Sequence, residues 1–371
     1  MILPSLVAIF LLTVAFICLI ILSFYYVFFF SQALKVDRIT SAQPPVSVII
    51  AARNEFKNLQ NNLASILSQN YPNYEVVVIN DCSYDDTKDY LDKLAKSEPK
   101  LKIVTLTIDE RFQRGKKFAL TMGIKAAAHE RLLFTDADCK PIDNKWIATM
   151  AKSFKNNTIT LGVAPLKTEN NLLGSIINYE TLHTAIQYLG YAKRNKAYMG
   201  VGRNLSYTKT VFFENKGFAS HQHIMSGDDD LFVQQAAKSV QVNTVVCSES
   251  FMYSPGPSDL GKFFKQKIRH LSTGKEYLSK YKTWLGMYSI SQIILYLSVI
   301  SFILYSSELW YIGATILLVK WLIQWVVIRK TAVHLGAKKI AYALPYYDIL
   351  YTFFLLTFGI AQVFIKPKTW N

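Results

Sequence analysis

Cysteine is sparse in this sequence, and its placement excludes two kinds of site. Four cysteines are scattered along 371 residues without a CxxC pair: Cys18, Cys82, Cys139 and Cys247. Structural zinc sites and disulfide frameworks need several cysteines at characteristic spacings. The sequence therefore predicts four reduced thiols, with neither a zinc site nor a disulfide scaffold.

Glycine-rich phosphate loops are also missing. The first β-branched run is followed by ARNE, which contains no glycine, and Gly115-Lys116-Lys117 lacks the upstream glycine spacing of a P-loop. Nucleotidyl transfer usually relies on a glycine-rich loop near the first strand. This reaction class is therefore disfavoured.

Charged side chains are absent from Met1–Phe30, which predicts a transmembrane helix. The stretch is longer than the apolar part of a signal peptide, and no basic segment precedes it. Three further apolar stretches are predicted to span the membrane: Trp284–Tyr305, Leu309–Ile328 and Tyr346–Ile365. Buried core helices are the alternative interpretation of these stretches.

Basic residues gather at one predicted side of the membrane: Lys35, Arg38, Lys275, Lys280, Lys282, Arg329, Lys330, Lys338 and Lys339. By the positive-inside rule, the N-terminus then lies outside and the section between the first two spans lies in the cytoplasm. Lys366 and Lys368 would fall on the wrong side, so a re-entrant or interfacial last segment remains an alternative.

Two ionisable residues lie within the predicted spans. Lys320 is mid-way along the third span and Asp348 is near the start of the fourth. Counted from the basic turn between these spans, Lys320 lies about two helical turns deep and Asp348 one or two, so a pair between them is one hypothesis. The alternative is that Lys320 snorkels toward the headgroups while Asp348 lies at the interface.

The net charge of +15 indicates anionic partners. Basic residues can hold a protein against anionic lipid and can offset phosphates in a site. Nucleic-acid binding is disfavoured because the aromatic residues lie mainly in the predicted membrane spans.

The section between the first two spans alternates strand and helix patterns. Predicted strands are Val46–Ala52, Glu75–Asn80, Lys102–Ile108 and Arg131–Asp138, and predicted helices are Asn58–Gln69, Thr87–Ala95 and Lys116–His129. This alternation predicts an α/β domain whose sheet is largely parallel and covered on both faces. Ligands of such sheets bind beyond the carboxyl ends of the strands, where Asp81 and Asp138 belong.

Polar residues after the strands predict a nucleotide site. Glu55 is a candidate for contact with the base or ribose, and Asp81 is a candidate ligand, although a capping role in an ordinary loop is the alternative at both places. Lys116 opens a predicted helix, where a lysine suits a diphosphate. A solvated basic turn explains Lys116 equally well.

Two acidic clusters are the strongest candidates for chemistry. Asp136 and Asp138 flank one residue of an expected strand, which puts both carboxylates on one face and predicts Mg²⁺ or Mn²⁺ between them. Asp228 and Asp229 precede a helical pattern, and neighbouring carboxylates raise each other's pKa toward that of a general base. Surface aspartates in a turn and a helix N-terminal charge cluster are the respective alternatives.

The segment GKFFKQKIRHLSTGK has the pattern of an amphipathic helix lying at the membrane surface. Gln266 and Arg269 are three residues apart and share a face of that helix. Arg269 can reach a pyrophosphate with two hydrogen bonds. A purely membrane-associated basic helix is the alternative.

Together these motifs resemble the inverting family 2 glycosyltransferases, the group that includes cellulose, chitin and hyaluronan synthases. The resemblance covers about 46–274 and rests on VSVIIAARNE, VVVINDCSYDDT, GKKFALTMG, TDAD, GDDD and QKIRH. It implies a GT-A fold, which is Rossmann-like, and a nucleotide-sugar donor, a UDP-sugar first of all. By motif, Glu55 and Asp81 would contact the base and ribose. Asp136 would contact ribose or metal, Asp138 the metal, and Asp229 would be the base beside Asp228.

The resemblance also extends to the acceptor side, with one departure. Gly200–Tyr207 is similar to the family's acceptor segment, whereas His270 replaces the tryptophan of the Q-x-x-R-W motif of processive members. That change puts processive synthesis in doubt. The resemblance implies a single transfer to a lipid-linked or glycan acceptor, with a processive, product-exporting synthase or a non-catalytic scaffold as alternatives.

The expected organisation follows from the spans and the resemblance. We expect a transmembrane helix over 1–30, a linker over 31–45, a GT-A domain over 46–260, an interfacial amphipathic segment over 261–283 and three transmembrane or partly re-entrant helices over 284–366. The expected location is a membrane, the bacterial inner membrane first of all, with the catalytic domain in the cytoplasm and bound to membrane lipids.

Overall fold

The computed structural model describes residues 5–35, 37, 40–107, 115–224 and 226–364. Its contacts divide the chain into two compact units. Residues 35–169 and 191–258 form a unit built on β-strands, called here the sheet unit. Residues 1–34, 170–190 and 259–368 form the helical unit. Residues 170–190 thus group with the apolar helices, and the domain boundaries expected from sequence stay a prediction.

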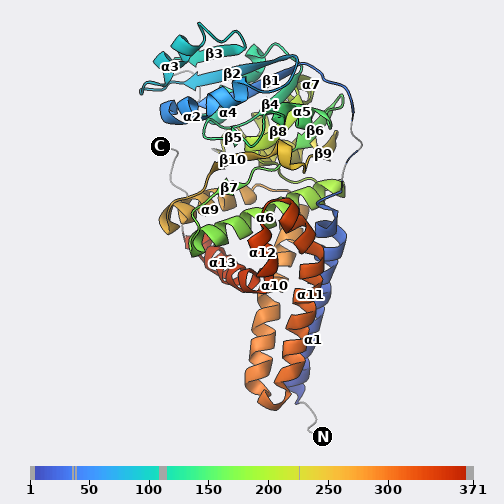
Figure 1. Ribbon diagram of the computed structural model, residues 1–371. Helices are drawn as coiled ribbons and strands as arrows, with labels where there is room; N and C mark the ends of the chain where they lie inside the picture. Colours follow the sequence, from blue (N-terminus) through green and yellow to red (C-terminus); the bar gives the residue numbers. More distant parts are fainter. Residues whose placement is uncertain (1–4, 36, 38–39, 108–114, 225, 365–371) are drawn as a thin grey trace. The chain divides into compact units, whose positions relative to one another are not determined.

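The sheet unit is organised by a seven-stranded sheet in the order β3-β2-β1-β4-β8-β6-β9 (Figure 1). The strands are β1 Val46–Ala52, β2 Tyr74–Asp81, β3 Leu101–Leu106, β4 Arg131–Phe134, β6 Thr158–Leu161, β8 Leu205–Thr208 and β9 Gln241–Thr244. Neighbours pair in parallel except at β8, which is antiparallel to both β4 and β6. The predicted α/β class with a mostly parallel sheet is confirmed.

Helices and a small sheet complete this unit. The helices are α2 Phe56–Leu67, α3 Thr87–Leu94, α4 Lys116–Ala126, α5 Trp146–Ala151, α7 Lys209–Glu214 and α8 Asp230–Ala236. The small sheet has the order β5-β10-β7, with bounds β5 Lys140–Pro141, β7 Leu166–Lys167 and β10 Met252–Pro255.

Alternating side chains of the central strands bury both faces of the large sheet. Val48 and Val76 belong to a buried cluster that also includes Leu59 and Leu63 of α2. On the other face, α4 comes so close that a Cβ on Gly123 would lie 2.4 Å from Cδ1 of Ile79. The period-2 pattern of buried strands therefore places α2 and α4 on opposite faces.

Strand β4 is shorter than the sequence predicts. It ends at Phe134, so the prediction of an extended strand through Asp138 is wrong. The Cys139 N–H donates to the Asp136 carbonyl, which closes a turn. The polar residues after Phe134 form local hydrogen bonds instead of pairing with a neighbouring strand, as aspartates near turns do. Asp136 and Asp138 are therefore brought together by a turn and not by strand alternation.

Other element boundaries differ by a few residues, as is usual at frayed ends. The predicted helix from Lys116 ends at Ala126, three residues before His129. The predicted strand from Lys102 begins at Leu101 and ends at Leu106, and Ile108 lies outside the described residues.

Among the described residues, the helical unit has four helices long and apolar enough to cross a membrane: Leu6–Gln32, Ser279–Tyr305, Ser307–His334 and Leu344–Ala361. They correspond to α1 Leu6–Phe24 with the turns that follow it, α10 Ser279–Tyr305, α11 Trp310–His334 and α13 Leu344–Phe364. The four predicted apolar helices are confirmed. Met1–Pro4, Ile365, Lys366 and Lys368 lie outside the described residues.

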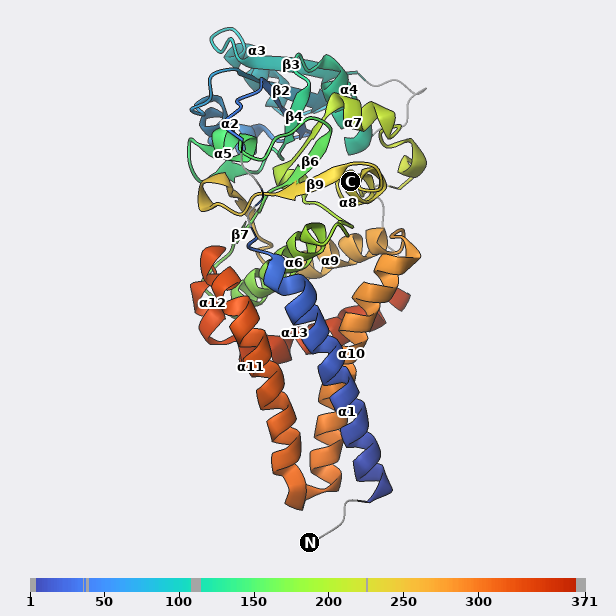
Figure 2. The ribbon, with the colours of Figure 1, turned by 90° about the vertical axis from the view of Figure 1, so that its right-hand side faces the viewer.

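Three of these helices run side by side, as Figure 2 shows for α1, α10 and α11. Shorter elements of the unit are the first part of α6 Leu172–Lys193, α9 Leu260–Gly274 and α12 Lys338–Tyr342. Helix α9 packs on α13 through aromatic pairs. Phe263 lies 5.2 Å from Phe354 and Phe264 lies 4.8 Å from Phe358, measured between ring centroids.

A buried polar cluster joins the apolar helices. Lys320 of α11 forms an ion pair with Asp348 of α13, and their side chains are 0% and 1% exposed. The amides of Gln292 and Gln324 donate to Oδ1 of Asp348 at 3.0 and 2.8 Å. The predicted pairing of Lys320 with Asp348 is confirmed, and snorkelling of Lys320 is excluded because its ammonium is fully enclosed.

Removal of either member of this pair should destabilise the protein strongly, because it leaves an uncompensated charge among apolar helices. We expect Lys320→Met or Asp348→Leu alone to cost about 3–5 kcal/mol, and the double change to recover part of that loss. Recovery stays partial because Gln292 and Gln324 lose their acceptor. Melting temperatures in detergent, with Lys330→Met on the exposed side of α11 as the control, measure this; additive losses would contradict it.

Candidate functional site

A pocket lies in the sheet unit beyond the carboxyl end of β4. It is lined by residues from four separate segments: Lys116 and Leu120; Phe134, Thr135 and Asp136; Gly202, Leu205 and Tyr207; and Asp228 and Asp229. The start of α4, the turn after β4 and the segments before β8 and α8 therefore meet at one place. This is the edge at which an open α/β sheet places its ligands.

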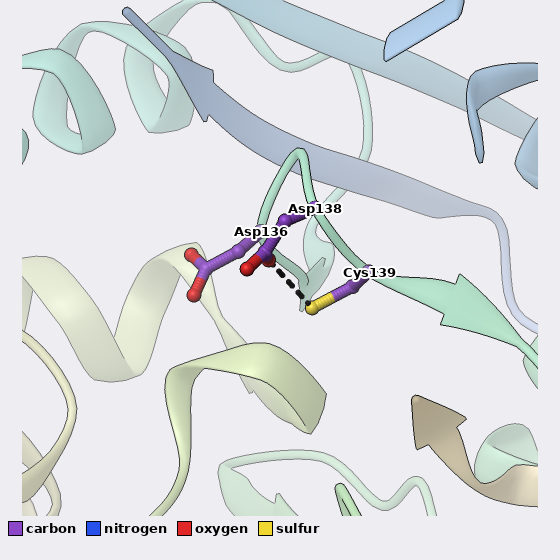
Figure 3. Close-up of side chains that lie close together, drawn as sticks. All are labelled: Asp136, Asp138 and Cys139. Atoms are coloured by element: carbon purple, nitrogen blue, oxygen red, sulfur yellow. Dashed lines mark hydrogen bonds between the residues drawn. The ribbon is translucent and has the colours of Figure 1, made fainter. Parts of the chain in front are cut away.

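The turn after β4 carries a candidate metal centre. Asp136, Asp138 and Cys139 offer two carboxylate oxygens and a sulfur that all lie within 4.8 Å of one another (Figure 3). Burial raises the pKa of Asp138, and the neighbouring Asp136 carboxylate raises it further. A divalent cation would offset this repulsion, so the two aspartates fit the predicted Mg²⁺ or Mn²⁺.

Cys139 suits such a cation poorly, and the sequence did not single it out as a ligand. Its side chain is fully buried, and burial raises the pKa of its thiol above the usual range. The thiol stays protonated and donates to Oδ1 of Asp138 at 3.3 Å. Its contact with Asp138 makes Cys139 a support for the carboxylate, because hard cations prefer oxygen ligands.

Lys116 bridges the two acidic clusters. Its Nζ lies 2.8 Å from Oδ1 of Asp136 and 3.2 Å from Oδ2 of Asp228. Burial acts to lower the pKa of Lys116, but these carboxylates raise it well above the usual range. The ammonium therefore stays charged inside the pocket. Contact of Lys116 with a diphosphate remains a prediction.

The adjacent lysine has a different role. The Lys117 ammonium donates to the backbone carbonyls of His221 and Ile224 at 2.6 and 2.9 Å. Burial lowers the pKa of Lys117 to about 8. Lys117 thus tethers the segment that leads to Asp228, and the alternative of a solvated basic turn fails for this residue because its side chain is buried.

Asp229 has features of both roles that the sequence left open, a general base and a charge at a helix N-terminus. It is the N-cap of α8, and its Oδ1 accepts from the Asp230 N–H at 2.8 Å. Its Oδ2 accepts from the Gly202 N–H at 2.8 Å. Burial, followed by the charge of Asp228, raises the pKa of Asp229 to about 6. A carboxylate with that pKa is suited to general-base chemistry near neutral pH.

The predicted nucleotide residues lie at the ends of β1 and β2. Asp81 is the last residue of β2 and is 6% exposed. Glu55 precedes α2, and burial raises its pKa while the charges of Asp138 and Asp136 add to the rise. The capping alternative applies instead to Asp85, which accepts from the N–H groups of Thr87 and Phe56. Base and ribose contacts of Glu55 and Asp81 stay predictions.

Gln266 and Arg269 lie on α9, the amphipathic helix that the sequence predicts. This helix belongs to the helical unit, whereas the pocket is lined by residues of the sheet unit. Their contact with a leaving diphosphate therefore remains a prediction. Lys267 on the same helix forms an ion pair with Glu180 of α6.

Several pocket residues were not singled out by the sequence analysis: Leu120, Phe134 and Thr135, and three residues of the segment 200–207, which it treated only as a whole. Gly202 lies in the short 3₁₀ turn Gly202–Asn204, and Leu205 and Tyr207 alternate along β8. The signal that finds them is the period-2 alternation of β8, which points alternate residues to one face.

Part of the chain is similar to known proteins. Residues 47–212 match the model of glycosyl transferase family 2. The poly-beta-1,6-N-acetyl-D-glucosamine synthase of Staphylococcus epidermidis is 28% identical over 270 residues, which cover 69% of this chain and 62% of that protein. The synthase of the same name from Staphylococcus aureus is 24% identical over 245 residues, or 63% and 55%. The chain thus spans less than two thirds of these relatives.

Among solved structures, the mannosyltransferase PcManGT from Pyrobaculum calidifontis, in complex with GDP-Man and Mn²⁺, is similar with a TM-score of 0.56. The comparison covers 96% of this chain and 98% of that one at 17% identity. At this identity the likeness shows a shared fold.

The candidate metal centre makes a prediction that does not depend on activity. Asp138→Asn keeps the shape of the side chain but removes the charge, and should weaken Mn²⁺ binding at least about tenfold, since hard cations need anionic oxygen ligands. The spectrum of free Mn²⁺ in a titration measures this. Asp92→Asn, on the exposed side of α3, is the control and should bind as the wild type does. Equal affinity of all three proteins would contradict the site.

Proposed function

We propose that this protein, whose residues 47–212 match the model of glycosyl transferase family 2, transfers a sugar from a nucleoside-diphosphate sugar to a lipid-linked or glycan acceptor, with inversion. The observation that carries the proposal is the pocket itself. A carboxylate whose pKa is raised to about 6 lies in the same pocket as the turn that carries the aspartate pair.

The proposed reaction is a single in-line displacement. The acceptor hydroxyl attacks the anomeric carbon from the face opposite the nucleoside diphosphate, and Asp229 takes the hydroxyl proton. The new glycosidic bond forms as the bond to the diphosphate oxygen breaks, which inverts the configuration. Two backbone N–H groups hold Asp229, so its oxygens keep one orientation. A positioned general base of this kind contributes about 10²–10⁴-fold to rate.

Negative charge develops on the leaving diphosphate, and the proposed site supplies positive charge for it. Asp136 and Asp138 would hold Mg²⁺ or Mn²⁺, which neutralises diphosphate oxygens when bound. Lys116 would add its charge from the start of α4. Glu55 and Asp81 would bind the base and ribose, while Gln266 and Arg269 would reach the diphosphate from α9.

The donor proposed first is UDP-N-acetylglucosamine. The two curated relatives are named for a polymer of N-acetyl-D-glucosamine, whereas the solved relative was obtained with GDP-Man. Processive synthesis is the second candidate because those curated relatives are polymer synthases, yet His270 stands at the tryptophan position of Q-x-x-R-W. Four helices long enough to span favour a membrane-bound protein acting on an acceptor in the lipid. The bacterial inner membrane is the proposed location.

A donor screen tests the function. Protein in native membranes should release UDP from UDP-N-acetylglucosamine faster than from UDP-glucose, with GDP-mannose as the third donor, and EDTA should abolish release. Product chains longer than one added sugar would favour the processive candidate. Absence of release from every donor, together with absence of donor binding, would overturn the proposal.

Asp229 gives a second test with a defined pH dependence. A base works only when deprotonated, so wild-type kcat/KM should be constant above pH 7 and fall about tenfold per unit below pH 6, because burial and Asp228 raise the pKa of Asp229 to about 6. Asp229→Asn should cut transfer at least about a hundredfold while the donor Kd stays within about twofold.

The neighbouring aspartate is the matched control. Asp228→Asn should retain more transfer than Asp229→Asn, since Asp228 pairs with Lys116 and the backbone amides orient Asp229. An inactive Asp228→Asn beside an active Asp229→Asn would exchange the two roles.

A further inference from the structure

The carboxylate of Asp229 is held on both of its oxygens by the backbone. The Gly202 N–H donates to Oδ2 and the Asp230 N–H donates to Oδ1, each at 2.8 Å. Two donors on opposite oxygens fix the plane of a carboxylate, and each oxygen keeps a lone pair for a proton. One donor belongs to the same helix start as Asp229, whereas the other comes from a residue 27 positions away.

The approach of Gly202 leaves little room for a side chain. A Cβ added there would lie 3.3 Å from Oδ2 and 3.5 Å from Cβ of Asp229, with Oδ2 of Asp228 at 3.7 Å. The first of these distances is tighter than ordinary van der Waals contact. Glycine therefore lets the backbone lie against the carboxylate, in the way that glycines allow close approach elsewhere.

The turn that carries Gly202 is anchored in the core by Asn204, which is fully buried. Its Oδ1 accepts from the Trp146 indole at 3.0 Å, and its Nδ2 donates to the carbonyls of Val163 and Ser250 at 2.9 and 2.8 Å. Three hydrogen bonds to three different segments fix the side chain, and through it the turn. A buried side-chain amide with all of these hydrogen bonds formed makes the segments that it connects rigid.

We propose that Gly202, anchored by Asn204, is a positioning residue that orients Asp229 toward the acceptor hydroxyl. The inference rests on the proposed function, since it assumes that Asp229 is the base, and it adds the group that aims it. The Asp230 amide alone lets the carboxylate rotate about that single bond. The Gly202 amide removes this freedom, and misplacement of a reacting group by about 1 Å can cost about a hundredfold in rate.

Two substitutions at Gly202 test the contact of its amide with Asp229. Gly202→Ala adds a Cβ and keeps the N–H. Gly202→Pro removes the N–H and places the ring Cδ where the proton was, so the Asp229 carboxylate has to move away. Gly202 is the first residue of its 3₁₀ turn, and the preceding Val201 has φ −117° and ψ 112°. Proline is tolerated at a first helical position, and extended geometry is what the residue before proline adopts. The main chain before Gly202 therefore suits proline, and the two variants differ at the carboxylate.

The expected result is a split between rate and binding. Gly202→Pro should have a kcat at least about tenfold below that of Gly202→Ala, with the donor KM of the two within about twofold. Loss of the amide should also move the acid limb of the pH profile upward, since that hydrogen bond favours the charged form of Asp229. Asp228, Lys116 and Tyr207 also lie near Asp229 and are the same in both variants. Equal kcat and equal pH limbs would overturn the proposal.

A stability cycle decides the contact without any need for turnover. The melting temperature of Gly202→Pro should lie below that of Gly202→Ala, and the difference should vanish in an Asp229→Ala background, where no carboxylate is left to hold. A difference that persists there would overturn the contact. If the wild type neither binds nor turns over any donor in the screen, the proposed function fails; a cycle that still shows coupling then assigns the Gly202 contact to the fold alone and overturns the positioning role.

Discussion

Repulsion between carboxylates is the constraint around which the pocket is built. Asp136, Asp138, Asp228 and Asp229 lie at one edge of the sheet, where each negative charge and the loss of water raise the cost of ionising the next. Lys116 offsets two of these charges directly. Backbone amides at the start of α8 and before β8 offset a third. The remaining charge, on Asp138, has a thiol donor and space for a cation beside it.

The sheet and its helices were predictable because their signals are local. Runs of β-branched residues such as Val46–Ala52 mark buried parallel strands, and the alternation with helical spacing sets the order of elements. The proximity of Asp136 to Asp138 was predicted on an incorrect basis: their spacing of two residues suits a strand, but hydrogen bonds within the segment close a turn instead. For two carboxylates that are two residues apart, a strand and a turn both bring the side chains together.

Contacts between distant segments were beyond the sequence. The ion pair of Lys116 with Asp228 joins residues 112 positions apart, and the Gly202 amide reaches Asp229 across 27. In the helical unit, depth counted along two helices predicts that Lys320 and Asp348 meet. The same count is silent about Gln292, because its role depends on how α10 packs against α13. A sequence pattern predicts how deep a residue lies along a helix and which face it occupies. Its partners on a third helix can be found only from how the helices pack.

The reversed direction of β8 determines which kind of loop reaches the pocket. In a parallel sheet, each loop at this edge leaves the end of a strand, as happens after Asp81, the last residue of β2, and at Asp136 after β4. Because β8 runs antiparallel to β4, its first residue, Leu205, pairs with the last residue of β4, Phe134. Gly202 therefore arrives on a loop that enters a strand. Asn204, between Gly202 and that strand pair, is fixed in the core, so a residue inserted between Gly202 and Leu205 would shift the Gly202 amide away from Asp229.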